Sequence, residues 1–170
     1  MEPAKKEPAV TKLIFVNLPV SDLARATAFY QAVGAEKNPQ FSDDTASCMV
    51  ISETIHTMLL THDKFRQFTP KKIADAKTHS EVLICLSADS REAVDDMVGK
   101  AEAAGGAVDP CPKQDYGFMY GRSFEDPDGH IWEVMWMDVA AAQAAMEECP
   151  MSEAGQSKNM AQNAARTVAA

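Results

Sequence analysis

The two halves of this sequence begin in the same way, and this repeat constrains the fold more than any other feature. Residues 12–18 (KLIFVNL) alternate as a strand does, and a helix capped by Ser21 or Asp22 follows directly. Residues 80–87 (SEVLICLS) are also typical of a strand, and Asp89 with Glu92 marks the start of a second helix. The two first strands lie about seventy residues apart.

Further strands follow each helix. In the first half, residues 47–51 and 55–61 predict a hairpin. In the second half, residues 117–124 and 130–137 are joined by Asp-Pro-Asp-Gly, which suits a type I turn. The sequence therefore predicts an α+β fold of two tandem βαβββ modules. A ferredoxin-like sandwich is the alternative, but it does not predict that both halves open with the same junction.

Composition and length set the domain organisation. The chain has 170 residues, of which 46% are hydrophobic, enough for the core of one domain. We expect a disordered arm over residues 1–10, a globular domain over 11–138, and a tail over 139–170. We expect the tail to begin as an alanine-rich helix and to continue as a polar, disordered segment.

Charge, hydropathy and cysteine spacing indicate where the chain works. A net charge of −9 repels phosphate backbones, so nucleic acid is not expected as a partner. We expect no secretory signal, because the first ten residues lack an apolar stretch, and we expect no membrane span, because no apolar run is long enough. The four cysteines are far apart and include no C-x-x-C pair. We expect a reducing, cytoplasmic setting without disulfides.

Three segments, FVNLPVSDLARATAFY, AEAAGG and FEDPDGHIWEV, together resemble the vicinal oxygen chelate superfamily. That group includes glyoxalase I, bleomycin-resistance proteins, fosfomycin-modifying enzymes and extradiol dioxygenases. The resemblance covers about residues 11–138. It implies βαβββ modules forming a cupped mixed sheet around a ligand cavity, and a homodimer as the assembly.

The same resemblance implies a divalent metal held by the first and last strands of each module. Matching the motifs places the four ligand positions at Phe15, at or next to Leu59, at Leu83 and at Glu133. Only Glu133 retains a group that can bind a cation. Glyoxalase I and dioxygenase chemistry depend on the metal, so neither activity is expected.

The histidines do not restore this site. His56 and His62 are about 20 Å apart along one strand, too far to bind one ion. Their parity is opposite to that of Leu59, so we expect them to face away from the cavity. His79 begins a strand, and His130 follows the turn, where we expect it to face solvent.

Glu81 is the one acid that could join Glu133. It shares the parity of Leu83 and lies about 6.6 Å from it along the strand. A pair formed by Glu81 and Glu133 could hold Mg²⁺ or Mn²⁺ weakly, with waters completing the coordination. The alternative for Glu81 is a solvated acid near a strand start.

Apolar residues at three of the four expected metal-ligand positions favour a different kind of site, a mostly apolar pocket with few polar groups. Side chains expected to face it with Glu133 are Phe15, Leu59, Leu83, Met135 and Met137. There Glu133 could donate a hydrogen bond, bind a ligand cation or act as a general base. Alternatively, it only satisfies neighbouring polar groups such as Asn17 or Tyr120.

Two segments flank this pocket in the expected arrangement. Residues 113–122 hold Tyr116, Tyr120 and Arg122, which suit an anionic or aromatic ligand, or else form a packed strand with an exposed arginine. Residues 64–72 form a basic, aromatic connector between the halves, and this connector is either solvated or a lid.

Three hypotheses remain open: an enzyme that uses Glu133 as acid and base, a binder that sequesters a small molecule, and metal-dependent chemistry at a rebuilt Mg, Mn, Ni or Zn site. The candidate catalytic residues are Glu133, Glu81 and Tyr120. The candidate ligand-binding residues are Phe15, Asn17, Leu59, Leu83, Tyr116, Arg122 and Met135.

Overall fold

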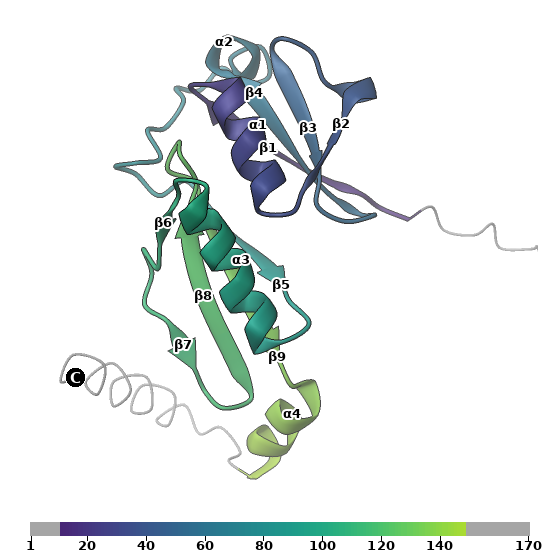
Figure 1. Cartoon of the computed structure of the whole chain (residues 1–170), viewed down its shortest axis with the longest axis vertical. Coiled ribbons are helices and arrows are strands. Elements are labelled where there is room, and N and C mark those ends of the chain that lie inside the picture. The colour runs from purple at the N-terminus through teal and green to yellow at the C-terminus, as the bar shows by residue number, and fades with distance from the viewer. Residues whose placement is uncertain (1–10, 149–170) are drawn as a thin grey trace, which may run out of the picture.

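The computed structural model describes residues 11–148, and these form two modules, each with its own mixed sheet (Figure 1). The expectations for residues 1–10 and 149–170 lie outside the described residues. The first module has a four-stranded sheet in the order β1-β4-β3-β2. Its elements are β1 (Ile14–Val20), α1 (Leu23–Ala32), β2 (Glu36–Asn38), the 3-10 turn η1 (Pro39–Phe41), β3 (Ala46–Val50), β4 (Ile55–Thr61) and α2 (His62–Phe65).

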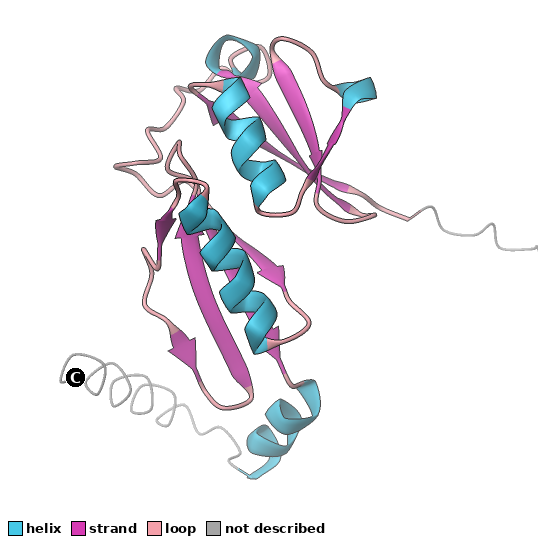
Figure 2. Cartoon of the chain, viewed as in Figure 1, coloured by secondary structure: helices cyan, strands magenta, loops and turns pink. Residues whose placement is uncertain are grey.

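The second module has a sheet in the order β5-β9-β8-β6, with β7 also paired to β8. Its elements are β5 (Leu83–Ser87), α3 (Arg91–Ala103), β6 (Ala107–Val108), β7 (Gln114–Asp115), β8 (Met119–Glu125), β9 (Ile131–Met137) and the following α4 (Val139–Glu148). Figure 2 shows the two sheets with α1 and α3 each lying along one of them.

Each module brings its first strand beside its last strand. β1 pairs in parallel with β4, and β5 pairs in parallel with β9, while the hairpins β3–β4 and β8–β9 are antiparallel. A parallel pair needs a crossover, which α1 and α3 begin. The predicted α+β class with two tandem βαβββ modules is confirmed, and two separate sheets exclude the ferredoxin-like alternative.

Local signals in the sequence explain where the helices begin and end. The Asp22 side chain caps α1 by accepting a hydrogen bond from Arg25 N at 2.9 Å. Ser90 caps α3 in the same way, one residue later than the expected Asp89. Gly34 follows α1 with φ of +109°, a conformation that suits glycine.

The core of the molecule lies under α1 and α3 and is continuous between the modules. Tyr30 of α1 packs edge-on against Trp132 of β9, with ring centroids 5.9 Å apart. The Tyr30 hydroxyl accepts a hydrogen bond from Trp132 Nε1 at 2.9 Å and donates one to Asp126 Oδ2 at 2.8 Å. Burial, followed by the charge of Asp126, raises the pKa of Tyr30 well above its ordinary value. The modules therefore share an aromatic core in which the polar atoms of Tyr30 and Trp132 are hydrogen-bonded.

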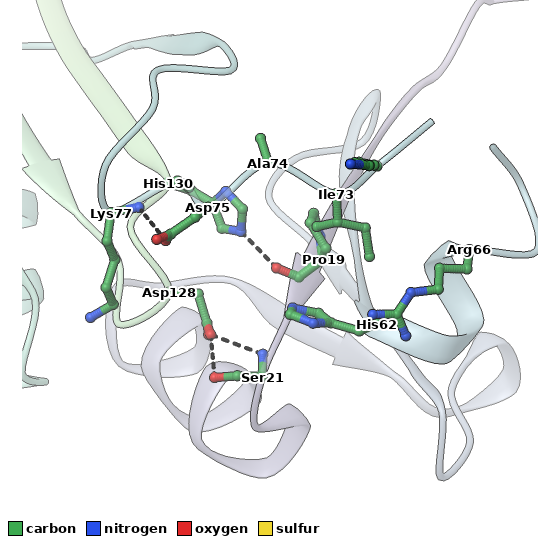
Figure 3. A pocket seen from close by; sticks show the side chains of 12 residues that line it. Pro19, Ser21, His62, Arg66, Ile73, Ala74, Asp75, Lys77, Asp128 and His130 are labelled. Carbon is green, nitrogen blue, oxygen red and sulfur yellow. Dashed lines mark hydrogen bonds between the residues drawn. The ribbon is translucent and has the colours of Figure 1, made fainter. Parts of the chain in front are cut away.

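A polar junction adds to this core at the Asp-Pro-Asp-Gly turn (Figure 3). Asp128 Oδ1 accepts hydrogen bonds from the backbone nitrogen and hydroxyl of Ser21, at 2.9 and 2.5 Å. His130 contacts the Pro19 carbonyl oxygen through Nε2 at 2.9 Å and the Glu81 carboxylate through Nδ1. The expectation that His130 faces solvent is wrong, because its side chain is buried between the modules.

Candidate functional site

Glu133 faces the open side of the second sheet. Its neighbours Trp132 and Val134 are buried in the core beneath α3, and alternation along β9 turns Glu133 to the opposite face. The strand register places Cys85 of β5 on one side of Glu133 and Ser123 of β8 on the other. These three side chains form a row across the middle of the sheet.

A cavity of about 170 Å³ lies over this row. The segment before β7 forms one wall, and Ser123 fixes it there, because its hydroxyl accepts a hydrogen bond from Cys111 N at 3.1 Å. The residues that line the cavity are Cys85, Cys111, Pro112, Gln114, Met119, Gly121, Arg122, Ser123, Glu133, Val134 and Met135. Four of these side chains carry sulfur, so the wall is soft and weakly polar.

The charge of Glu133 reaches Cys85. Burial, followed by the negative charge of Glu133, raises the pKa of the Cys85 thiol above its ordinary value. Cys85 therefore stays protonated and neutral. Within residues 11–148, no hydrogen bond or ion pair occupies the Glu133 carboxylate. The cavity thus presents a carboxylate among thiol and thioether groups.

Tyr120 and Arg122 lie on the other face of the sheet from Glu133, which corrects their expected position beside it. The register pairs Tyr120 with Trp136 and Arg122 with Val134, both on the helix side. The Tyr120 hydroxyl donates to Asp95 at 2.9 Å. Arg122 lines the cavity, but its guanidinium bonds Asp95 and Asp109, so it offers no free charge to a ligand.

Tyr116 and Glu81 are also separate from the Glu133 cavity. Tyr116 lies in the turn between β7 and β8, where its ring stacks with Phe118 at 6.3 Å. Glu81 lies before β5 and is bound to His130 at the module junction. Neither side chain lines the cavity over Glu133, and of the other predicted second-module residues only Arg122 and Met135 do.

In the first module, Phe15 and Asn17 lie on the outer face of β1. Phe15 is 49% exposed, and its ring stacks on His56 at 4.8 Å. His56 is therefore on the same face as Phe15. Its parity is opposite to that of Leu59, as expected, but Leu59 and not His56 is the residue that faces away from Phe15. Leu59 is fully buried, because the parallel register pairs it with core residue Leu18, and Met58 takes the outer position beside Asn17.

The family's metal-ligand positions do not fit a divalent ion in this chain. Phe15 and Leu83 carry no donor atom, and Met58 supplies only a thioether at the position expected for Leu59. Within residues 11–148, no three His, Cys, Asp or Glu side chains gather as they would to hold a metal.

Sequence reasoning missed Cys85, Cys111, Ser123 and Met119. The signal for Cys85 was available, since it has the parity of Leu83, but the parallel pairing that places it beside Glu133 was not predicted. Cys111 carried no signal, because it lies in a loop that reaches the cavity through a hydrogen bond to β8.

This fold and this site define a two-module protein in which one acid, Glu133, lines a cavity on the open face of the second sheet. A family model described as the Glyoxalase/Bleomycin resistance protein/Dioxygenase superfamily matches residues 12–134. The chain belongs to this superfamily, in agreement with the resemblance found in its sequence. No match was found among curated protein sequences.

Solved structures share this fold. Hypothetical protein SA1046 from S. aureus is 26% identical, with a TM-score of 0.63 over 75% of this chain and 95% of that one. A glyoxalase/bleomycin resistance protein/dioxygenase family enzyme from Burkholderia phytofirmans is 22% identical, with a TM-score of 0.60 over 75% and 100%. The fosfomycin resistance protein FosX from Listeria monocytogenes is 21% identical, with a TM-score of 0.56 over 76% and 94%. At 22% and 21% identity, the last two structures show similarity of fold alone.

Within residues 11–148, no helix has both the length and the apolar character needed to cross a membrane.

Proposed function

We propose that this protein binds a small, mostly apolar molecule in the cavity over Glu133, and that Glu133 holds a cationic or hydrogen-bond-donating group of that molecule. The observation that carries the proposal is the position of Glu133. It is the acidic residue of a sulfur-rich cavity, and no residue of the described chain neutralises it. A carboxylate in weakly polar surroundings gains most from a partner that supplies a positive charge or a donor.

An enzymatic role is the second candidate and uses the same group. Because Cys85 is held neutral and Arg122 is occupied by Asp95 and Asp109, both lone-pair-bearing oxygens of Glu133 remain available. Such a carboxylate can accept a proton from a bound substrate as a general base. Sequestration requires the binding step alone, and catalysis adds this proton transfer. The donor set offers no support for the third hypothesis, a rebuilt metal site.

We also propose that the protein is a homodimer in the cytoplasm. Phe15 and Leu83, on the outer faces of the two sheets, are each about half exposed, at 49% and 50%. Burial of such apolar surface by a second copy would stabilise the assembly. The three free thiols of the described chain suit a reducing compartment. Light scattering during gel filtration tests the dimer, and a monomeric mass at micromolar concentration would reject it.

The binding proposal is tested with benzylammonium and its neutral relative benzyl alcohol, titrated by calorimetry. We expect benzylammonium to bind more tightly to the native protein, and we expect Glu133→Gln to weaken it about tenfold or more. Benzyl alcohol should be affected less. Glu36→Gln on the exposed strand β2 removes the same charge elsewhere and should change neither affinity.

If benzylammonium fails to bind, or if Glu36→Gln weakens it as much as Glu133→Gln, the carboxylate is not a ligand anchor. For the enzymatic role, the rate with any substrate found should depend on Glu133 in its ionised form, and the Gln variant should retain binding but lose turnover.

A further inference from the structure

A second cavity, of about 440 Å³, lies where the two modules meet (Figure 3). It shares no lining residue with the cavity over Glu133. Its walls come from the end of β1, from α2 and the residue after it, from the linker over residues 72–77, and from the turn over residues 128–130. Segments far apart in the sequence thus enclose one space.

The linker wall is held in place by close packing. Gly129 has φ of +103°, and a Cβ built on it would lie 2.5 Å from the backbone nitrogen of Lys77. The linker therefore rests directly on the Asp-Pro-Asp-Gly turn. Asp75 supports it from within, since its side chain accepts hydrogen bonds from Lys77 N at 3.2 Å and from the Thr78 hydroxyl at 3.0 Å.

Basic side chains gather around this cavity. Lys72 and Lys77 form no ion pair within residues 11–148. Arg66 pairs with Asp63 at 2.6 Å, but both side chains are largely exposed, and an exposed pair of this kind is weak and exchangeable. In a chain with a net charge of −9, three cations gathered at one cavity offer an anion charged partners at this place.

Both acids of the cavity are engaged by the protein itself. The Asp75 carboxylate accepts hydrogen bonds within the linker, and Asp128 Oδ1 accepts two hydrogen bonds from Ser21 and pairs with Arg25 at 3.4 Å. Asp128 Oδ2 is buried and has no hydrogen-bond partner, and the side chain is only 8% exposed. A buried acceptor without a donor costs free energy, so a ligand that supplies a donor here is favoured.

We propose that this junction cavity is a second ligand site, for a small molecule that carries an oxyanion together with a hydroxyl or ammonium group. Arg66, Lys72 and Lys77 bind the phosphoryl or carboxylate group. Asp128 Oδ2 accepts the hydrogen bond of the neighbouring hydroxyl or ammonium. Because both modules contribute walls, an occupied site would also strengthen the contact between them.

Calorimetric titration with glycerol 3-phosphate, inorganic phosphate and lactate tests this proposal. We expect saturable binding of at least one probe, and tighter binding of glycerol 3-phosphate than of inorganic phosphate, which has no carbon-bound hydroxyl. The comparison with lactate identifies whether a phosphoryl or a carboxylate group is preferred. In Lys72→Gln/Lys77→Gln, two exposed positions where folding is not at risk, the affinity should fall tenfold or more.

A matched control, Lys12→Gln/Lys37→Gln, removes the same charge at exposed sites away from the cavity and should keep the native affinity. The Glu133→Gln variant should also keep it, so the result is independent of the function proposed above. The proposal is overturned if no probe binds saturably, if the two double variants weaken binding equally, or if glycerol 3-phosphate has no advantage over inorganic phosphate.

Discussion

Tyr30 donates a hydrogen bond to Asp126 at 2.8 Å, and this contact joins α1 of the first module to the β8–β9 turn of the second. The same hydroxyl accepts from Trp132, so removing it leaves a buried acceptor and a buried donor unsatisfied. We predict that Tyr30→Phe lowers the free energy of unfolding by about 1–3 kcal/mol. Urea denaturation measures this, with Tyr116→Phe in an exposed turn as the control. A loss no larger than that of the control would show that the contact contributes nothing to joining the modules.

The pH dependence of Asp115 reports on its pair with Arg91. Hydrogen bonds from the Arg91 guanidinium and then from Gly117 N lower the pKa of Asp115 from 3.8 to about 2. A lowered pKa in the folded state means that the stabilisation is present above pH 3.8 and is lost as the pH falls through about 2. We predict that carboxyl NMR gives a midpoint near the lower value, and that Arg91→Gln moves it upward. An unchanged midpoint would reject the pairing.

Gly129 tests whether the linker rests on the turn. Both Gly129 and Gly34 have positive φ, of +103° and +109°, so a side chain at either position strains the backbone. Only at Gly129 would the added Cβ meet backbone atoms of Lys77 and Ala76, at 2.5 and 2.7 Å. We predict that Gly129→Ala costs roughly 1–3 kcal/mol more than Gly34→Ala. Equal losses in thermal denaturation would mean that the linker is not seated there.

The closeness of Cys85 and Glu133 has a measurable effect on thiol reactivity. Because the thiolate is the reactive form and Glu133 raises the pKa of Cys85, neutralising this acid should lower that pKa. We predict that Glu133→Gln shifts the pH–rate profile for iodoacetamide alkylation of Cys85 to lower pH. Mass spectrometry of the labelled peptides separates Cys85 from Cys111. Burial is the larger cause of the raised pKa, so the profile should move only part of the way to that of a free thiol.

Metal-dependent glyoxalase activity is expected to be absent or very low. Three of the four positions that correspond to the family's metal ligands hold Phe15, Met58 and Leu83, whose side chains supply neither oxygen nor nitrogen. Only the fourth, Glu133, carries a carboxylate. We predict little lactoylglutathione from methylglyoxal and glutathione, with no rescue by Mg²⁺, Mn²⁺, Ni²⁺ or Zn²⁺. A stoichiometric metal in protein purified without chelators, lost in Glu133→Gln, would contradict this prediction.

The sequence predicted the module pattern well because its signals are local. Alternation in residues 12–18 and 130–137 depends on which side chains can face a core, and both strands form close to their predicted limits. The strands β2, β6 and β7 were not predicted. Each of these strands contains only two or three residues, and all residues of β2 and β7 are polar. Such short segments show no alternation, so only their pairing with a neighbouring strand defines them.

The candidate site was harder to predict, for two reasons. In β4 the consecutive residues Met58, Leu59 and Leu60 are all apolar, so the pattern does not indicate which face is buried, and the register with β1 decides it. For Arg122, the deciding partners are Asp95 and Asp109, which the fold brings together from different segments. Glu133 itself was predictable because buried residues flank it on both sides.

The parallel pairing of first and last strands also sets the order in which each module can assemble. The β3–β4 hairpin closes a short turn, whereas β1 must find β4 across the intervening helix and strands, from Ile14 to Ile55. Closing a longer loop costs more entropy and slows folding. We therefore expect the hairpin to form first and the amino-terminal strand of each module to dock last. During synthesis, the first module can close only after β4 has left the ribosome.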